Sequence, residues 1–269
     1  MLDFIADDQN VNDSGYGSAD EGADEHVKPY VHEGLDSKSL HFSILEIQSR
    51  MQISKPDVLE LEYTRTMMGF MMFKPRPEQM AMIGLGGGSL AKFCHRHLPS
   101  ASLVVVEINP HVIALREAFQ VPPDGARFQV IEADGARFVG QTDRRFDVLM
   151  VDAFDPHGMP AALGSRRFYD DCLDVLVSGG LMVVNLHAGH PHFPVYLERI
   201  RRSFGENVLR VDDKDGSNSV IFACKGDRLE RAGVAWTRRP ATLAPEPWEQ
   251  LRGAFARVAS AMPASARKP

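Results

Sequence analysis

The chain has 269 residues, of which 44% are hydrophobic and 25% are charged, so it can bury the core of one large domain with appendages. The net charge of −6 is unevenly distributed: the first 27 residues carry eight carboxylates and no Lys or Arg, which leaves 28 acidic against 30 basic residues elsewhere. This nearly neutral body gives no indication of a nucleic-acid-binding protein.

The chain begins with an acidic leader, which we place at residues 1–35. Carboxylates mixed with Gly, Ser, Asn and Ala predict a segment that does not fold on its own. The leader has neither the basic start nor the apolar stretch of a signal peptide. The cysteines Cys94, Cys172 and Cys224 lie far apart without Cys-x-x-Cys spacing, which is typical of a reducing compartment. We therefore expect a cytoplasmic protein without a membrane partner.

Residues 36–75 are expected to form a small unit ahead of the main domain. Alternating and partly β-branched residues over Leu40–Ile53 predict an antiparallel hairpin. Leu59–Phe73 predicts a helix that ends before Pro75 and Pro77. This Met-rich helix is too short to span a membrane, and we expect it to pack beneath a sheet.

Residues 76–226 alternate apolar runs with helical segments, which predicts a parallel sheet covered on both faces. The last two strands are joined by the short turn KDGSN, which is too short for a crossover, so this pair is expected to be antiparallel. The predicted fold is α/β, a doubly wound seven-stranded Rossmann-like sheet with an N-terminal β-hairpin element. Strands are expected at residues 79–85, 102–108, 127–133, 146–154, 181–187, 208–213 and 219–225, and helices at 89–97, 110–119, 135–139, 166–177 and 194–204.

A glycine-rich loop follows the first strand of this sheet. It places Gly84, Gly86, Gly87 and Gly88 at the carboxyl end of the strand, where open α/β sheets bind ligands and where glycine allows close backbone approach. Glu107 ends the next strand, where a carboxylate can accept hydrogen bonds from both ribose hydroxyls. Together these residues favour a nucleotide site over the alternative, a tight turn without a ligand.

Asp134 and Gly135 follow the third strand. A carboxylate there can bind an adenine amino group, and it can also cap the short helix that follows. Ser89 stands where a dinucleotide-binding motif has its last glycine, which weakens the case for a pyrophosphate. The glycine loop, the ribose acid and the third-strand acid therefore favour an S-adenosyl compound over a dinucleotide.

Two carboxylates follow the fourth strand in the same crevice. Asp152 and Asp155 stand three residues apart, and Pro156 stiffens the loop that carries them. Such a pair can hold a cationic amine and accept its proton. The alternative is a loop of solvated acids, which the adjoining ligand crevice disfavours.

Several motifs together resemble the spermidine synthase family, the polyamine aminopropyltransferases, over roughly Leu40–Gly226. They are IQSRM, GLGGGSLAKF, VVVEINPHVI, ADGARFV, FDVLMVDAFDP and RFYDDCLDVLVSGGLMVVNL. The resemblance implies the fold of seven-stranded S-adenosylmethionine-dependent methyltransferases and a homodimer. It also implies transfer of an aminopropyl group from decarboxylated S-adenosylmethionine to a small amine acceptor, with release of methylthioadenosine.

The resemblance implies roles for individual residues. Asp152 would take the proton of the attacking amine, and Asp155 would help to recognise that amine. Glu107 would bind ribose, Asp134 adenine, and Gln48 the nucleoside from the hairpin. The implied cofactor-binding set is Gln48, Gly84, Gly86, Gly87, Gly88, Ser89, Glu107, Asp134, Gly135 and Asp152, and the implied substrate-binding set is Tyr63, Arg65, Asp155 and His187.

The chain departs from the family pattern in three places. Its glycine loop lacks the family's Asp, which binds the amino group of the propylamine tail. The family's Tyr-His-Glu is Tyr63-Thr64-Arg65 here, and the late substrate-binding Tyr has no clear match in residues 209–218. An Arg would repel a cationic acceptor, so putrescine and spermidine are expected to be poor substrates. Undecarboxylated S-adenosylmethionine could also fit, so a methyl- or aminocarboxypropyltransferase and a non-catalytic nucleoside-binding homologue remain alternatives.

Two features remain. His187, His190 and His192 follow the fifth strand and could ligate zinc, but no Cys or acid adjoins them in the sequence, so no metal is expected and His187 is assigned to substrate contact. Residues 227–269 are expected to hold a linker and one helix around Trp248–Met262.

Overall fold

The structure is a computed structural model of the chain, and it describes residues 26–43, 47–154, 158–227, 229 and 239–263. Residues 1–25, most of the expected acidic leader, lie outside the described residues. Within the described part, no helix combines the length and the apolar character that crossing a membrane requires.

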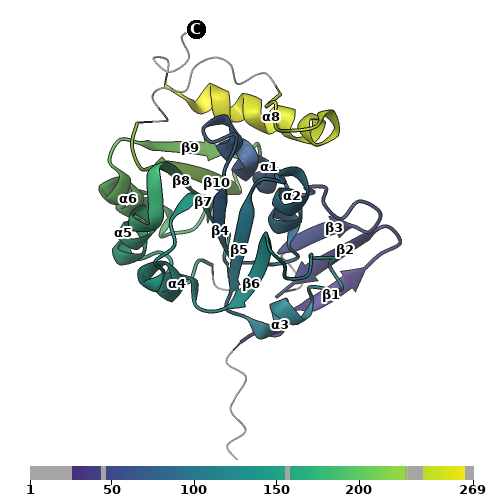
Figure 1. The fold of residues 1–269 in the computed structure, drawn as a ribbon. Helices are drawn as coiled ribbons and strands as arrows, with labels where there is room; N and C mark the ends of the chain where they lie inside the picture. The colour runs from purple at the N-terminus through teal and green to yellow at the C-terminus, as the bar shows by residue number, and fades with distance from the viewer. Residues whose placement is uncertain (1–25, 44–46, 155–157, 228, 230–238, 264–269) are drawn as a thin grey trace, which may run out of the picture.

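A seven-stranded sheet forms the centre of the molecule, in the order β6-β5-β4-β7-β8-β10-β9 (Figure 1). Its pairs are parallel from β6 to β8, and β10 runs antiparallel to both β8 and β9. The doubly wound sheet with one reversed strand, predicted from the apolar runs and the short last turn, is confirmed. The strands are β4 (Gln79–Ile83), β5 (Ser102–Glu107), β6 (Phe128–Glu132), β7 (Phe146–Val151), β8 (Leu176–His187), β9 (Val208–Asp212) and β10 (Asn218–Cys224).

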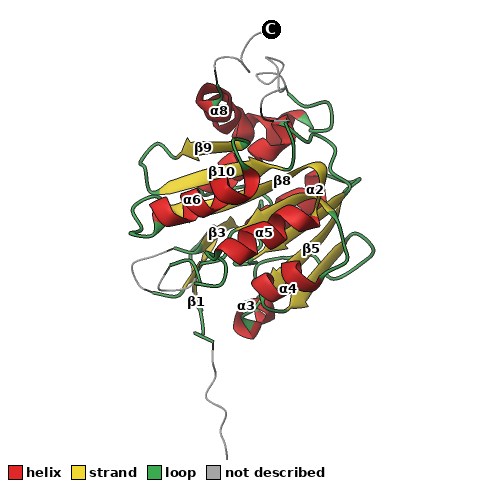
Figure 2. Cartoon of the chain, turned by 90° about the vertical axis from the view of Figure 1, so that its left-hand side faces the viewer, coloured by secondary structure: helices red, strands yellow, loops and turns green. Residues whose placement is uncertain are grey.

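Helices cover both faces of this sheet. Successive side chains of a strand point to opposite faces, so Met80 and Met82 of β4 join one buried cluster while Ala81 and Ile83 join the other. One face is covered by α4 (Gly135–Gln141), α5 (Arg166–Val175) and α6 (Phe193–Phe204), as Figure 2 shows. The other is covered by α1 (Glu62–Met67), the 3₁₀ helix η1 (Met68–Met72), α2 (Ser89–His97) and α8 (Pro245–Ala261). The short α3 (Pro110–Ala114) follows β5.

A second, smaller sheet precedes the main one. The predicted hairpin is confirmed as β2 (Ser37–His41) and β3 (Ser49–Gln52), and β1 (Tyr30–Glu33) adds a third antiparallel strand. This first strand lies within the segment 1–35, so the folded part begins earlier than its composition suggested. Backbone pairing with β2, and a hydrogen bond of 2.8 Å from the Asn109 side chain to the carbonyl of Val27, hold it in place.

Two predicted helices end earlier in the structure than the sequence suggested. The helix expected to reach Val177 ends at Val175, and Gly179 lies instead in an irregular part of β8, with a φ of 71° and its N–H donating to the carbonyl of Lys225 at 2.7 Å. The helix expected to reach Phe119 ends at Ala114, because the chain then turns to bury Phe119.

The helix expected over residues 59–73 begins at Glu62 and tightens into η1 after Met67. The 3₁₀ segment contains Gly69, where a Cβ would lie 2.8 Å from Val258 of α8 and 3.1 Å from Phe222 of β10. The predicted C-terminal helix is confirmed as α8, which is anchored to this region by an ion pair of 2.8 Å between Arg257 and Glu62.

Candidate active site

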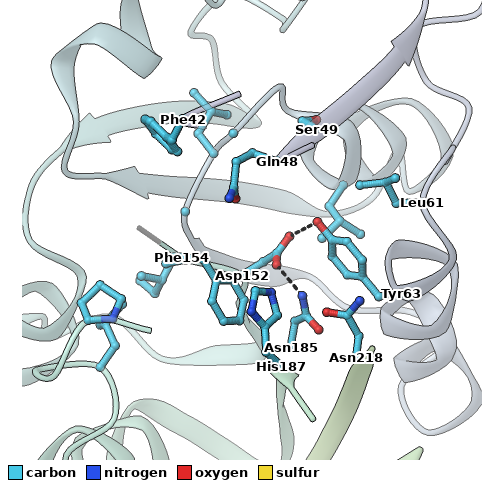
Figure 3. A pocket seen from close by; sticks show the side chains of 18 of the residues that line it. Phe42, Gln48, Ser49, Leu61, Tyr63, Asp152, Phe154, Asn185, His187 and Asn218 are labelled. Atoms are coloured by element: carbon cyan, nitrogen blue, oxygen red, sulfur yellow. Dashed lines mark hydrogen bonds between the residues drawn. The ribbon is translucent and has the colours of Figure 1, made fainter. Parts of the chain in front are cut away.

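A cavity of about 1170 Å³ lies at the carboxyl ends of the parallel strands, in the position that the topology of an open α/β sheet favours. The loops after β4, β5, β6, β7 and β8 form its floor, and the small sheet and α1 contribute to its wall. Figure 3 shows Gln48 pointing into it from the small sheet, while Tyr63, Asp152 and Asn185 meet on its other side.

The glycine loop divides into two glycines at the cavity and two that pack away from it. Gly84 has a φ of +93°, and a Cβ there would lie 2.2 Å from the carbonyl oxygen of Asp152. Gly86, with a φ of +52°, lines the cavity and leaves room above its backbone. Gly87 and Gly88 do not line it: a Cβ would lie 2.6 Å from Ser49 Oγ at Gly87 and 2.5 Å from Val121 at Gly88. Their small size serves packing of the loop against β3 and Val121.

Ser89 and Gln48 connect the glycine loop with the small sheet. The Ser89 hydroxyl lies at the cavity, 3.3 Å from the hydroxyl of Ser49 at the start of β3. Gln48 precedes that strand, and its backbone N–H donates to the carbonyl of Leu40 at 2.9 Å. Both residues line the cavity, in which the sequence analysis predicted a nucleoside.

Glu107 ends β5 with its carboxylate already held in place. Its Oε2 accepts from the backbone N–H of Leu85 at 2.8 Å, and its Oε1 accepts from that of Asn109 at 2.9 Å. Burial raises the pKa of this carboxyl, and the backbone donors oppose that rise. Each oxygen keeps acceptor capacity, so the carboxylate is positioned to bind two hydroxyl groups in the cavity.

Asp134 lines the cavity beyond β6 and also caps α4. Its Oδ1 accepts from the backbone N–H of Arg137 at 3.0 Å, so the capping alternative holds, and the side chain still borders the cavity. Gly135 follows because a Cβ there would lie 2.3 Å from Ile83 of β4.

Asp152, the first residue after β7, is the centre of the polar network in the cavity. Its Oδ2 accepts from the Tyr63 hydroxyl at 3.1 Å, and its Oδ1 accepts from Asn185 Nδ2 at 3.1 Å (Figure 3). Burial raises the pKa of Asp152 to about 6, although both donors oppose the rise. A carboxylate with this pKa is suited to accept a proton near neutral pH.

Of the remaining predicted substrate-binding residues, His187 lines the cavity and Arg65 does not. Asp155 lies outside the described residues. His187 lines the cavity and stacks on Phe154, with ring centroids 4.2 Å apart and planes 4° apart. Arg65 does not line the cavity, because its guanidinium donates to the carbonyl of Glu60 at 2.9 Å. The predicted repulsion of a cationic acceptor by Arg65 therefore loses its geometric basis.

The structure adds residues to the cavity that the sequence analysis missed. Asn185 at the end of β8 holds Asp152, and Asp213 and Asp215 lie in the turn between β9 and β10. The only signal that could have indicated them is the predicted strand order. Asn185 lies on β8, next to β7, and Asp213 and Asp215 precede β10, which is two strands from β7. Described lining residues include no Lys or Arg, and they include six carboxylates: Glu62, Glu107, Asp134, Asp152, Asp213 and Asp215. The cavity is therefore suited to a positively charged ligand.

His190 also lines the cavity and stacks on Tyr196. In the part of the chain that the structure describes, no group of three or more His, Cys, Asp or Glu residues is arranged to hold a metal ion.

A family model described as the spermine/spermidine synthase domain matches residues 60–208, which include the glycine loop, Glu107, Asp134 and Asp152. The chain belongs to this family. The resemblance indicated by the sequence motifs, and with it the transferase class, is confirmed. A polyamine aminopropyltransferase from Chromobacterium violaceum is 37% identical over 187 residues, which cover 69% of this chain and 72% of that relative.

Solved structures share the fold. A probable spermidine synthase from Corynebacterium glutamicum superposes with a TM-score of 0.64 at 17% identity, covering 90% of this chain and 92% of that one. A spermidine synthase in complex with the transition-state analogue AdoDATO gives a TM-score of 0.57 at 21% identity, covering 83% and 79%.

Proposed function

We propose that this protein transfers the aminopropyl group of decarboxylated S-adenosylmethionine to a small amine and releases methylthioadenosine. The observation that carries the proposal is the position of Asp152, held by Tyr63 and Asn185 beside a glycine loop in a cavity lined by carboxylates. Membership of the spermine/spermidine synthase family supports it.

The nucleoside half of the site is formed by residues on β4, β5 and β6. Gly86 allows a ligand to approach the backbone, Glu107 offers its carboxylate to the ribose hydroxyls, and Asp134 offers its own to the adenine amino group. When bound, the sulfonium compound supplies the electrophilic propyl carbon and methylthioadenosine as the leaving group.

The acceptor half lies around Asp152. The unprotonated acceptor nitrogen forms a bond to the propyl carbon as the carbon–sulfur bond breaks, and the electron pair of that bond stays on sulfur. The nitrogen then carries one proton too many, and Asp152 accepts it. Tyr63 and Asn185 hold the carboxylate during this step because each donates to one of its oxygens.

The charge of the cavity favours the decarboxylated form of the cofactor. A carboxylate on the propyl chain would need a cationic partner, and the described lining residues offer six carboxylates and no Lys or Arg. This argument holds even though the glycine loop lacks the family's Asp. It disfavours full S-adenosylmethionine, which the sequence left open.

Product analysis tests the proposal. The protein is incubated with a set of amines and either decarboxylated or full S-adenosylmethionine, and the nucleoside products are separated. Amine-dependent methylthioadenosine from the decarboxylated compound is the expected result. S-adenosylhomocysteine from the full compound would identify a methyltransferase instead, and no nucleoside product in either incubation would identify a binding protein.

We also propose that the protein acts as a cytoplasmic homodimer. Cys94, Cys172 and Cys224 are all buried thiols, which supports a reducing compartment. The dimer is implied by the family resemblance, and Tyr30 and Ile47 of the small sheet region are exposed apolar side chains that a partner could cover. Light scattering coupled to gel filtration would give the mass of a dimer, and a monomer mass at micromolar concentration would contradict the proposal.

A further inference from the structure

The helix that carries Tyr63 is too short to hold its own position. α1 has six residues, and its N-cap residue, Leu61, makes no side-chain capping hydrogen bond. A helix of this length is not stable in isolation, because so few hydrogen bonds do not recover the cost of forming the first turn. The position of Tyr63 therefore depends on the contacts that α1 makes with other elements.

Arg257 of α8 supplies two of these contacts on one face of α1. Its Nη1 lies 2.8 Å from Oε1 of Glu62, and its Nη2 donates to Oγ1 of Thr66 at 3.0 Å. Glu62 and Thr66 are four positions apart and so lie on the same face of the helix. Thr66 is fully buried, and its hydroxyl donates to the carbonyl of Glu62 at 3.3 Å. Arg257, Glu62 and Thr66 thus form a clamp that spans one turn of α1.

A second residue of α8 holds the chain just before α1. Oε1 of Gln250 accepts from the backbone N–H of Leu59 at 2.9 Å. Gln250 and Arg257 are two helical turns apart, so both contacts come from the same face of α8. α8 lies beside α1 (Figure 1) and beyond residues 60–208, the part of the chain that matches the family model. The anchor of α1 therefore comes from outside the matched domain.

The turn of α1 that the clamp holds also presents Tyr63 to Asp152. Tyr63 directly follows Glu62, roughly 100° further around the helix axis, and it lines the cavity. Its hydroxyl donates to Asp152 Oδ2 at 3.1 Å, which is long for a hydrogen bond from a hydroxyl to an oxygen. A small displacement of α1 away from β7 would therefore break this contact.

The clamp also brings a positive charge near the carboxyls of the cavity. Arg257 does not line the cavity, yet it lowers the pKa of Asp213, whereas Glu62 and Asp215 raise it as like charges. Loss of Arg257 would therefore act on the carboxyls through space, and it would also release α1. The two effects are separable, because only the release of α1 requires the Tyr63 hydroxyl.

We propose that Arg257 is a positioning residue for the reaction, which fixes α1 from α8 so that the Tyr63 hydroxyl stays on the carboxylate of Asp152. This inference rests on the proposed aminopropyl transfer, and it makes the C-terminal helix a working part of the active site. Arg257 lies outside the cavity lining and acts through Tyr63.

The acidic limb of the pH profile of kcat tests this role. The Tyr63 hydroxyl lowers the pKa of Asp152, so loss of their contact moves the limb to higher pH. Arg257→Met removes both arms of the clamp and should move the limb up by about one pH unit, which lowers turnover at pH 6.5 roughly 3-fold and at pH 8.5 less than about 2-fold. Arg252→Met is the matched control, since Arg252 is an exposed arginine of the same helix, 3.8 Å from Glu249, and should leave the limb in place.

Two further comparisons separate position from charge. In a Tyr63→Phe background, Arg257→Met should produce no additional shift of the limb. Thr66→Val removes one arm of the clamp without changing any charge, and it should move the limb in the same direction as Arg257→Met by a smaller amount. Thr66→Ser keeps the hydroxyl and should move the limb less than Thr66→Val does.

Three results would overturn the proposal. The first is an acidic limb that stays in place in Arg257→Met, and the second is an equal shift with and without the Tyr63 hydroxyl, which would assign the effect to charge alone. The third is an equal limb in Thr66→Val and Thr66→Ser, which also decides the question if the melting temperature shows that Arg257→Met does not fold.

NMR of the aspartate carboxyl carbons measures the ionisation of Asp152 without turnover, with its resonance assigned by its loss in Asp152→Asn. If wild type turns over no amine, but Arg257→Met raises the pKa of Asp152 only when the Tyr63 hydroxyl is present, the transfer reaction is refuted and the positioning by Arg257 stands. If transfer occurs and neither the limb nor the resonance moves in Arg257→Met, the reaction stands and the role of Arg257 is refuted.

Discussion

The hydroxyl of Tyr63, on α1, donates to Oδ2 of Asp152, at the end of β7, across 3.1 Å. The two residues are 89 positions apart in the chain, and the contact joins the helix ahead of the main sheet to its central strand. Burial and this carboxylate together raise the pKa of Tyr63 well above its ordinary value, so Tyr63 remains a donor throughout the physiological range.

Replacement of Asp152 tests its role as the base. Asp152→Asn keeps the shape of the side chain and loses its basicity, so turnover should fall by roughly 10²–10⁴. Binding of methylthioadenosine, measured by calorimetry, should change much less. In wild type, kcat should rise with pH as Asp152 ionises, with an acidic limb near its pKa of about 6. Normal turnover of the variant with any accepted amine would remove Asp152 from the mechanism.

Tyr63→Phe should shift this acidic limb to higher pH. The Tyr63 hydroxyl lowers the pKa of Asp152, so its removal lets burial raise that pKa further. Turnover at pH 6.5 should fall roughly 10-fold, because a hydrogen bond to a charged group contributes about 1.5–3 kcal/mol. Tyr30→Phe makes the same change at the exposed small sheet and serves as the control. A limb that stays in place in Tyr63→Phe would show that this donor does not set the ionisation of Asp152.

Glu107→Ala should weaken binding of methylthioadenosine by about 1.5–3 kcal/mol, because it removes charge-assisted hydrogen bonds to two hydroxyls. Glu132 offers a matched control, since it is the register partner of Glu107 on β6, is exposed and does not line the cavity. Glu132→Ala should leave the dissociation constant unchanged. An unchanged constant in Glu107→Ala, measured by calorimetry, would contradict the ribose assignment.

Stability should depend on pH through two buried carboxyls. Burial raises the pKa values of Asp152 and Asp213 from 3.8 to about 6, so between pH 4 and 6 the folded protein holds protons that the unfolded chain has released. The free energy of unfolding contributed by each must then fall as pH rises, by about 1 kcal/mol between pH 5 and 7. Urea denaturation of Asp213→Asn should show a shallower loss over this range than wild type. Identical slopes would mean that folding does not raise the pKa of Asp213.

Truncation should locate the start of the folded part. Deletion through Asp24 removes only residues outside the described part, and the melting temperature and nucleoside binding should persist. Deletion through Gly34 also removes β1 and the Val27 carbonyl that accepts from Asn109, so the melting temperature should fall by several degrees. A comparable fall in the shorter deletion would show that the acidic leader docks on the body.

The sequence alone predicted the sheet and the acids at its strand ends. Apolar runs that are buried on both faces mark parallel strands, and the carboxyl ends of such strands meet along one edge of a sheet. Glu107, Asp134 and Asp152 each directly follow or end such a run, so their convergence on one cavity follows from topology. The family resemblance rested on the same positions.

Only the tertiary structure decided which neighbours of these positions face the cavity. Tyr63 and Arg65 are two residues apart on α1, which places them roughly 200° apart around the helix axis, and packing turned Tyr63 inward. The sequence does not distinguish Gly87 and Gly88 from the other glycines of the loop. In the structure, Gly87 packs against Ser49 and Gly88 packs against Val121. Asp213 reached the cavity because β10 reverses beside β8, a long-range pairing that no local pattern around residue 213 encodes.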